Sequence, residues 1–416
     1  MKKVISDKNI PAIRFQGFEE GWKEKKLEKV GDFSKGRGYS KKHLLKSGCP
    51  IILYGRLYTK YQTIIEDVDT FVIPQKDSVY SRGNEVIVPS SGETAEDISR
   101  ASAVLKAGIV LGGDLNVVSP FENISPVFLA LSISNGTSKR ELSKRAQGKS
   151  VVHLHNSDLR SVKFFHPCLA EQTHIGNYFN KLDGLILLQE QKLEKITNLK
   201  KAMLEKMFPK ENTDVPEIRF SGFTEKWQNK KLGEVSESLE YGLNAAAIKY
   251  DGINKYLRIT DIEENSRRFI LETLTSPDTD LSNADSYKLR QGDILFARTG
   301  ASVGKTYHYS EKDGLVYFAG FLIRARIKPN TDSEFVFQNT LKVEYSKFIK
   351  ITSQRSGQPG VNAKEYSEFA IKMPVLLEQQ KIGQYFQSLD KIISQSQQKI
   401  QQLKNLKQAM LQKMFI

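Results

Sequence analysis

The stretch that decides the fold runs from LAEQTHIGNYFNKLD to NLKKAMLEKMF, over residues 169–208. It returns as LLEQQKIGQYFQSLD to NLKQAMLQKMF over residues 376–415, and about half of the aligned positions are identical. Chance does not produce a match of this length, and self-similarity at a fixed period marks a repeat architecture. The chain is therefore a tandem duplication of a unit of about 205 residues.

A second repeat opens each copy. PAIRFQGFEEGWKEKKLEKV (11–30) and PEIRFSGFTEKWQNKKLGEV (216–235) are identical at 12 of 20 positions. The intervening stretches, 31–160 and 236–366, share only scattered features. Similar frames around divergent centres favour one scaffold that displays two specificities. The alternative is a duplication that simply drifted, more slowly in its helices than elsewhere.

Both long repeats show the spacing of a coiled coil, because their apolar residues alternate at intervals of four and three. The predicted seam consists of Ile175, Phe179, Leu182, Ile186, Ile196, Ile382, Phe386, Leu389, Ile393 and Leu403. Polar residues interrupt it at Gln189, Lys200, Ser396 and Lys407. Either these polar residues fix the register, or the seam shifts locally so that Leu199 and Leu406 replace them.

Each long helix is expected to extend for about 55 Å, at 1.5 Å per residue. Two similar amphipathic helices in one chain most simply pack on each other. If they pair antiparallel, a pseudo-two-fold axis relates the two domains. The alternative is that each helix packs only on its own domain.

The divergent centres combine short apolar strands with Gly-containing turns, as in GDILFARTG (292–300). The predicted fold class is α+β: two mixed α/β domains joined by two long helices that pack as an antiparallel coiled coil. The predicted boundaries are 1–166 for the first domain, 167–210 for its helix, 211–373 for the second domain and 374–416 for its helix.

The charge balance points to a polyanionic partner. Lys and Arg number 62 against 48 Asp and Glu, so the net charge is +14 and the pI is about 9.4. No run approaches 18 apolar residues, which excludes a transmembrane helix, and MKKVISDKNI lacks the apolar core of a signal peptide. The two cysteines, Cys49 and Cys168, are too few for a zinc cluster or a disulfide framework. We therefore expect a cytoplasmic protein.

The sequence carries no convincing catalytic motif. Residues 300–306, GASVGKT, resemble a phosphate-binding loop but have three residues between the glycines instead of four. The residues that follow predict a strand, whereas such a loop needs a helix whose N-terminus faces the phosphate. His153 and His155 lack further metal ligands nearby. A nucleotide-binding enzyme that uses Gly300–Thr306 and a coiled-coil scaffold that binds only protein are kept as alternatives.

Several loops carry the side chains that nucleic-acid readers use: cations, hydroxyls, amides and aromatic rings beside glycines. The candidate DNA-binding residues of the first domain are Arg37, Tyr39, Ser90, Ser91, Glu93 and Lys149. Those of the second domain are Tyr241, Arg258, Arg298, Thr299, Ser302, Lys305, Gln358 and Asn362. Together with the net charge they favour DNA binding over a merely solvated surface.

These features resemble the specificity subunit of type I restriction–modification enzymes. The resemblance rests on the paired lead-ins IRF-x-GF-x-x-x-W, on GDILFARTGASVGK (292–305), and on the doubled P-x-x-x-EQ-x-x-IG-x-YF-x-x-LD at 167–183 and 374–390. It covers nearly the whole chain. The first domain departs from the ARTG form and reads PSSGE at 89–93.

The resemblance implies that each domain is a target recognition domain that reads one half of a bipartite double-stranded DNA sequence. It implies that the helices set the spacer and help to hold two methyltransferase subunits, which carry S-adenosylmethionine. A restriction subunit that uses ATP and Mg²⁺ to translocate DNA would complete the nuclease. By the same resemblance this chain is non-catalytic, without a cofactor or metal of its own.

Overall fold

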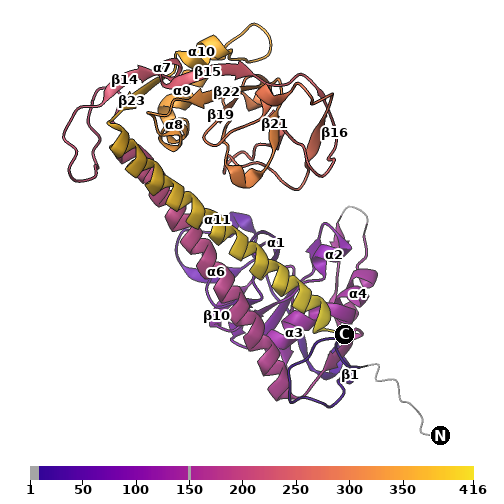
Figure 1. Ribbon diagram of the computed structural model, residues 1–416. Coiled ribbons are helices and arrows are strands. Elements are labelled where there is room, and N and C mark those ends of the chain that lie inside the picture. Colours follow the sequence, from indigo (N-terminus) through magenta and orange to yellow (C-terminus); the bar gives the residue numbers. More distant parts are fainter. Residues whose placement is uncertain (1–8, 149–150) are drawn as a thin grey trace. The chain divides into compact units, whose positions relative to one another are not determined.

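The computed structural model describes residues 9–148 and 151–416 (Figure 1). The chain divides into two compact units, Met1–Glu190 with Gln398–Ile416, and Gln191–Gln397. Each unit contains one mixed domain, one part of the helix α6 (Leu169–Lys206) and one part of the helix α11 (Leu376–Lys413). This division cuts both helices, whereas the predicted boundaries keep each helix whole.

An antiparallel sheet lies at the centre of the first unit. Its strands follow the order β2-β11-β7-β9-β4, and only the edge pair β9–β4 is parallel. These strands are β2 (Gly31–Lys35), β4 (Ile64–Ile65), β7 (Glu85–Pro89), β9 (Ser102–Val104) and β11 (Leu115–Pro120). A second sheet has the order β5-β3-β10-β6, formed by β3 (Cys49–Ile52), β5 (Phe71–Val72), β6 (Tyr80–Arg82) and β10 (Ala107–Leu111).

Short elements complete this unit. They are β1 (Lys23–Lys26), β8 (Ser91–Gly92), β12 (Val152–His153), β13 (Lys163–His166), α1 (Arg56–Thr59), α2 (Ala95–Ile98), α3 (Pro126–Ile133), α4 (Gly136–Arg145) and α5 (Asn156–Arg160). The start of α3 follows directly from its sequence. The Ser125 hydroxyl accepts a hydrogen bond from the Phe128 N–H, and Pro126 occupies the first turn, where no N–H is needed.

The second unit repeats this topology. Its central sheet has the order β15-β22-β19-β20, all antiparallel, which matches the first four strands of the other sheet. The strands are β14 (Gln228–Lys231), β15 (Ser236–Tyr241), β16 (Ala246–Lys249), β17 (Lys255–Leu257), β18 (Thr275–Asp278), β19 (Ile294–Ala297), β20 (Thr306–His308), β21 (Val316–Phe318), β22 (Leu322–Ile327) and β23 (Ala370–Met373). The shorter helices are α7 (Leu232–Val235), α8 (Ser333–Asn339), α9 (Val343–Thr352) and α10 (Ala363–Ser367).

The two long helices pack on each other in both units. In the first unit, Asp183 pairs with Lys407 at 2.5 Å and Glu190 with Lys404 at 2.7 Å. As the residue numbers increase along α6, those of their partners on α11 decrease, so the two helices run antiparallel. In the second unit the Lys200 ammonium donates to both carboxylate oxygens of Asp390, at 2.7 and 2.8 Å. The predicted α+β class with an antiparallel helix pair is confirmed.

These ion pairs decide the open question about the seam. The side chains of Lys200 and Lys407 are only 14% and 21% exposed, because each faces an aspartate of the other helix. Leu199 and Leu406 are 43% and 41% exposed. The polar residues therefore stay on the seam and specify its register, and no local shift brings the leucines inward.

The predicted seam residues divide between two environments. Leu182, Ile186 and Leu403 form an apolar cluster between the helices. Residues nearer the helix starts belong instead to the domain cores: Ile175 and Phe179 to the first, and Ile382, Phe386 and Leu389 to the second. Ile196 and Ile393 are half-buried. The heptad pattern at the helix starts thus reflects packing against a domain as well as against the other helix.

The segment after each helix fills a core formed mostly by the other copy's sequence. In the first unit, the ring of Phe415 lies 5.8 Å from that of Phe128 and 6.1 Å from that of Phe179. In the second, the ring of Phe208 lies 5.3 Å from that of Phe335 and 5.9 Å from that of Phe386. Each unit therefore needs both repeats to complete its core.

The repeated lead-in segments are held by equivalent ion pairs. The Arg14 guanidinium donates to both oxygens of Glu171 at 2.6 and 2.7 Å, and that of Arg219 to Glu378 at 2.7 and 2.8 Å. Both carboxylates are fully buried. Hydrogen bonding to Glu378 raises the pKa of Arg219, so its guanidinium stays charged. The IRF motif is therefore explained by the attachment of the lead-in to the start of the long helix.

Replacing Glu378→Ala is expected to lower the free energy of unfolding of the second unit by about 3 kcal/mol, because it leaves the Arg219 guanidinium without its buried partner. Thermal unfolding measures the loss. The control is Glu368→Ala, which removes an exposed pair with Lys231 and should cost less than about 1 kcal/mol. Equal losses in the two variants would contradict the role given to the buried pair.

Reversing one charge on the seam, Lys200→Asp, is expected to destabilise the second unit by about 2 kcal/mol, because two carboxylates then face each other. The double variant Lys200→Asp with Asp390→Lys should recover most of that loss in urea unfolding. Lys404→Glu is the matched control, since Lys404 and Glu190 are about half exposed and their pair is worth little. Failure of the double variant to recover would show that the pair does not specify register.

Candidate nucleic-acid interface

In the second unit, two loops lie side by side at the end of the central strand β19. Thr299 forms a β-bridge with Gly360, and the Gly300 N–H donates to the Pro359 carbonyl at 3.0 Å. The Val361 N–H donates to the Arg298 carbonyl at 2.9 Å. Gly300 has φ +68°, a conformation that favours glycine, and it lets the chain turn into this contact. The structure thus joins two segments that the sequence analysis named separately.

Arg298 lies over an aromatic ring at this place. Its guanidinium carbon is 5.0 Å from the centroid of the Tyr241 ring, which is a cation–π contact. The Tyr241 hydroxyl in turn accepts a hydrogen bond from the Ala363 N–H at 3.2 Å. No carboxylate pairs with Arg298 among residues 9–148 and 151–416. Its donors are therefore held in place by the ring but remain available to an external acceptor.

The amides of this region have different surroundings. The Asn362 side-chain oxygen accepts from the Glu365 N–H at 2.9 Å and so caps α10. Asn362 is still exposed. Gln358 is exposed in the loop, and its amide lies beside Gly300, where a Cβ would come within 2.8 Å of it. Tyr241, Arg298, Thr299, Gln358 and Asn362, called the β19 surface below, are thus brought together.

Three other candidates of the second domain are less accessible: two are paired with acidic residues of the same unit, and one is half-buried. The Lys305 ammonium lies 2.8 Å from a Glu264 oxygen, donates to the Ile262 carbonyl, and its side chain is 12% exposed. The hydrogen bond from Lys305 lowers the pKa of Glu264. Arg258 donates to both oxygens of the buried Asp261, which raises the pKa of the guanidinium. Ser302 lies in the 3₁₀ turn Gly300–Ser302, half-buried.

The first unit has an equivalent pair of loops with different side chains. The Leu154 N–H donates to the Ser90 carbonyl at 3.1 Å, as Val361 does to Arg298. Ser90 is buried, at 6% exposed, so its hydroxyl does not reach the surface. The Ser91 hydroxyl lies 3.3 Å from Nδ1 of His153, and Glu93 is exposed. Ser90 thus takes the place of Arg298, and the paired residues Ser91 and His153 take the places of Thr299 and Gly360.

The remaining candidates of the first domain lie in the loop after β2. Tyr39 has φ +59°, and its hydroxyl lies 2.5 Å from that of Ser78 and accepts from the Gln75 N–H at 2.7 Å. Arg37 makes only a loose pair with Asp77 at 3.8 Å, and both side chains are about 70% exposed. Lys149 lies outside the described residues.

The structure adds exposed side chains that the sequence analysis did not select. Phe321 is 58% exposed, and its carbonyl accepts the Arg298 N–H at 3.0 Å, which places its backbone beside the β19 surface. It lies within the apolar run VYFAGFLI (316–323), a pattern typical of a buried strand, so its exposure could not be predicted from the sequence. His153 is the last residue of β12 and His155 precedes α5; both are exposed, and their rings stack with centroids 6.4 Å apart.

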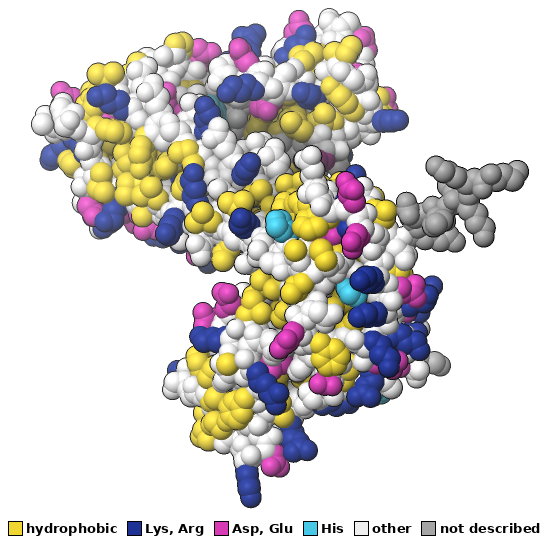
Figure 2. Space-filling view, turned by 90° about the horizontal axis from the view of Figure 1, so that it is seen from below, with side chains coloured by type: hydrophobic (Ala, Val, Ile, Leu, Met, Phe, Trp, Pro, Cys, Tyr) yellow, Lys and Arg dark blue, Asp and Glu magenta, His cyan; other side chains and the backbone are white. Residues whose placement is uncertain are grey.

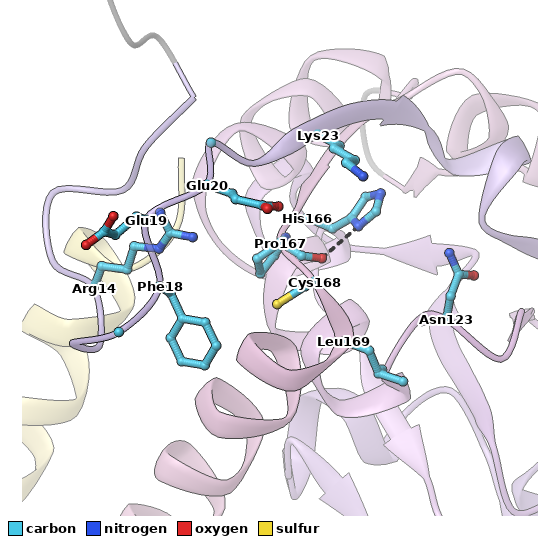
Figure 3. A pocket seen from close by; sticks show the side chains of 12 residues that line it. Arg14, Phe18, Glu19, Glu20, Lys23, Asn123, His166, Pro167, Cys168 and Leu169 are labelled. Atoms are coloured by element: carbon cyan, nitrogen blue, oxygen red, sulfur yellow. Dashed lines mark hydrogen bonds between the residues drawn. The ribbon is translucent and has the colours of Figure 1, made fainter.

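Figure 3 shows a pocket of about 410 Å³ in the first unit, at the start of α6. His166 on its wall is buried; burial lowers its pKa, and its Nδ1 lies 3.0 Å from the Pro167 carbonyl oxygen. The Cys168 thiol is exposed. Within the described part of the chain, no three His, Cys, Asp or Glu side chains are grouped to hold a metal ion.

One face of the molecule is mixed in charge. In Figure 2, Lys and Arg side chains are scattered over this face among acidic and apolar groups and do not form one continuous basic patch. Among the described helices, none is long and apolar enough to cross a membrane.

Comparison with known proteins gives the family. Residues 19–198 and 224–405 match the family described as type I restriction modification DNA specificity domain. The MjaVIII specificity subunit of Methanocaldococcus jannaschii is 21% identical over 292 residues, 65% of each chain. The MjaX specificity subunit of the same organism is 27% identical over 197 residues, 46% of each. The matches thus span less than two thirds of these relatives.

Two solved structures share the fold. The S subunit of the type I restriction–modification system from M. genitalium is 14% identical, with a TM-score of 0.64 over 98% of this chain and 99% of that one. The second structure was solved to explain complex assembly and conformational transition of the type I R-M system. One of its chains is 17% identical, with a TM-score of 0.52 over 95% of this chain and 98% of that one. With two matched copies that cover most of its length, the chain belongs to the type I restriction modification DNA specificity domain family.

Proposed function

We propose that this chain is the sequence-reading subunit of a type I restriction–modification complex, and that each domain binds one half of a bipartite double-stranded DNA target. One observation carries the proposal. The two copies keep the same sheet order and helix frame, whereas Ser90 and Ser91 in one copy stand where Arg298 and Thr299 stand in the other. A frame that stays constant while its surface loops change is suited to reading two different sequences.

The side chains of the two loops supply the chemistry that base recognition needs. A guanidinium such as that of Arg298 can donate two hydrogen bonds to guanine N7 and O6, and an amide such as that of Gln358 can pair with adenine. The same guanidinium also suits a phosphate. In the first domain, the hydroxyl of Ser91 and the imidazole of His153 offer a different set of donors and acceptors. The net charge of +14 supports salt-dependent affinity for the DNA backbone.

The proposal includes the partners that the family implies. Residues 1–166 and 211–373 act as the recognition domains, and helices 167–210 and 374–416 set the spacer and help to hold two methyltransferase subunits. S-adenosylmethionine binds to those subunits, and ATP and Mg²⁺ to a restriction subunit. This chain contributes positioning and recognition, and no chemical step is assigned to its own residues.

The nucleotide-binding alternative is not supported by the geometry of 300–306. The Lys305 ammonium, which a phosphate-binding loop would direct at its ligand, is paired with Glu264. The loop leads into the strand β20 and not into a helix. The family match over both copies also leaves the protein-only scaffold without support.

Exchanging residues 226–366 for those of a relative with a different target is expected to change only one half of the methylated sequence, because the other domain keeps its own loops. Genome-wide mapping of methylated bases in cells that carry the exchanged chain and its partner subunits measures this. The matched control exchanges residues 31–160 and should change the other half. A change in both halves after a single exchange would contradict independent reading.

Replacing Arg298→Ala is expected to weaken binding to the cognate duplex about tenfold and to reduce the slope of log affinity against log salt by about one. Lys305→Ala, in the same loop, should leave that slope unchanged, because its charge is already paired with Glu264. Fluorescence anisotropy at several salt concentrations compares the two. A loss of slope only in the Lys305 variant would reverse the assignment.

A further inference from the structure

We propose that Phe321 is a specificity-determining residue of the second domain, and that its ring contacts the 5-methyl group of a thymine in the half-site that this domain reads. The inference rests on the proposed function. It adds a residue to the reading surface and names the chemical group that this residue recognises.

The backbone that carries Phe321 is fixed on every side. The Leu322 N–H closes a tight turn onto the Ala319 carbonyl at 2.8 Å, and the Gly320 N–H donates to the Leu243 carbonyl at 2.8 Å. The Phe321 carbonyl itself accepts the Arg298 N–H. The ring therefore extends from a rigid turn, and ordering it against a ligand costs little entropy.

Close packing also holds this turn beside the end of β15. A Cβ on Gly242 would lie 2.3 Å from the Ala319 carbonyl oxygen, so only glycine allows this approach. The preceding residue is Tyr241, whose ring carries Arg298. Phe321 is thus anchored to the same backbone that positions the hydrogen-bonding groups of the β19 surface.

The exposure of Phe321 is exceptional for its segment. Its neighbours Phe318 and Leu322 are fully buried, whereas 58% of Phe321 faces solvent. An apolar ring beside hydrogen-bond donors matches the major groove of an A·T pair, where the thymine methyl group is the apolar feature beside hydrogen-bonding edges. B-DNA is therefore the occupant that this combination of groups fits.

The first domain lacks this feature. Leu115 pairs with Pro89 as Leu322 pairs with Ala297, so the residue that corresponds to Phe321 is Asp114. Asp114 has φ +57° and carries a carboxylate in place of a ring. An apolar reader in one copy and an acidic side chain in the other are expected if the two domains read different base pairs.

The test uses the full chain assembled with its methyltransferase subunits. Each thymine of the second half-site is replaced singly by deoxyuridine, which lacks the methyl group, and affinities are measured for the wild type, Phe321→Ala and Ile351→Ala. Ile351 is 73% exposed in the same unit and is the matched control for loss of an exposed apolar side chain.

The wild type and Ile351→Ala are expected to lose about fourfold in affinity at one thymine position, the worth of one buried methyl group. Phe321→Ala should bind the thymine duplex more weakly than the wild type does. Replacing the thymine at that position by deoxyuridine should not lower its affinity further. An equal further loss in Phe321→Ala, no sensitive position in the wild type, or a half-site without thymine would overturn the inference. In each of these cases specific binding persists and the proposed function stands; absence of any bipartite target would overturn both.

Discussion

The structure depends on the closure of each unit by the segment that follows a helix of the other copy. Phe415 enters a core with Trp22, Phe128 and Phe179, and Phe208 enters one with Trp227 and Phe335. The backbone reinforces this closure, because the Ile13 N–H donates to the Lys413 carbonyl and the Ile218 N–H to that of Lys206. Burial of a phenylalanine ring is worth about 2 kcal/mol, so neither unit is complete without both repeats.

Because the segment after each helix must reach its place in a core, the two helices have to pack in one register, and the polar seam residues specify it. An apolar seam alone tolerates displacement by a turn, but an Asp–Lys pair is satisfied in one register only. Asp183 with Lys407 and Asp390 with Lys200 are the same two repeat positions used twice. The duplication thus provides each aspartate with its partner on the other helix.

The copies have diverged inside as well as at the surface. In the second unit a hydrogen-bonded chain of side chains connects the sheet to the helix pair, through His308, Glu334, Gln338, Asp390 and Lys200. Burial disfavours the charged form of Glu334, but the hydrogen bonds from His308 and Gln338 and the charges of His308 and Lys200 together outweigh it and lower its pKa. The corresponding positions of α3 in the first unit are Val127 and Leu131, which are apolar. One frame therefore supports a polar and an apolar attachment of domain to helix.

The sequence by itself determined the duplication, the two long helices, the polar positions on their seam and the α+β class, because these depend on local spacing and on repetition within the chain. The tertiary structure alone decided which charges are paired. Lys305 and Arg258 look as available as Arg298 in the sequence, yet Glu264 and Asp261 neutralise the first two. The tertiary structure also decided that Phe321 is exposed although its neighbours are apolar, because it lies on a turn that is hydrogen-bonded to Leu243 and Arg298. Such pairings join residues far apart in the chain, and local pattern carries no information about them.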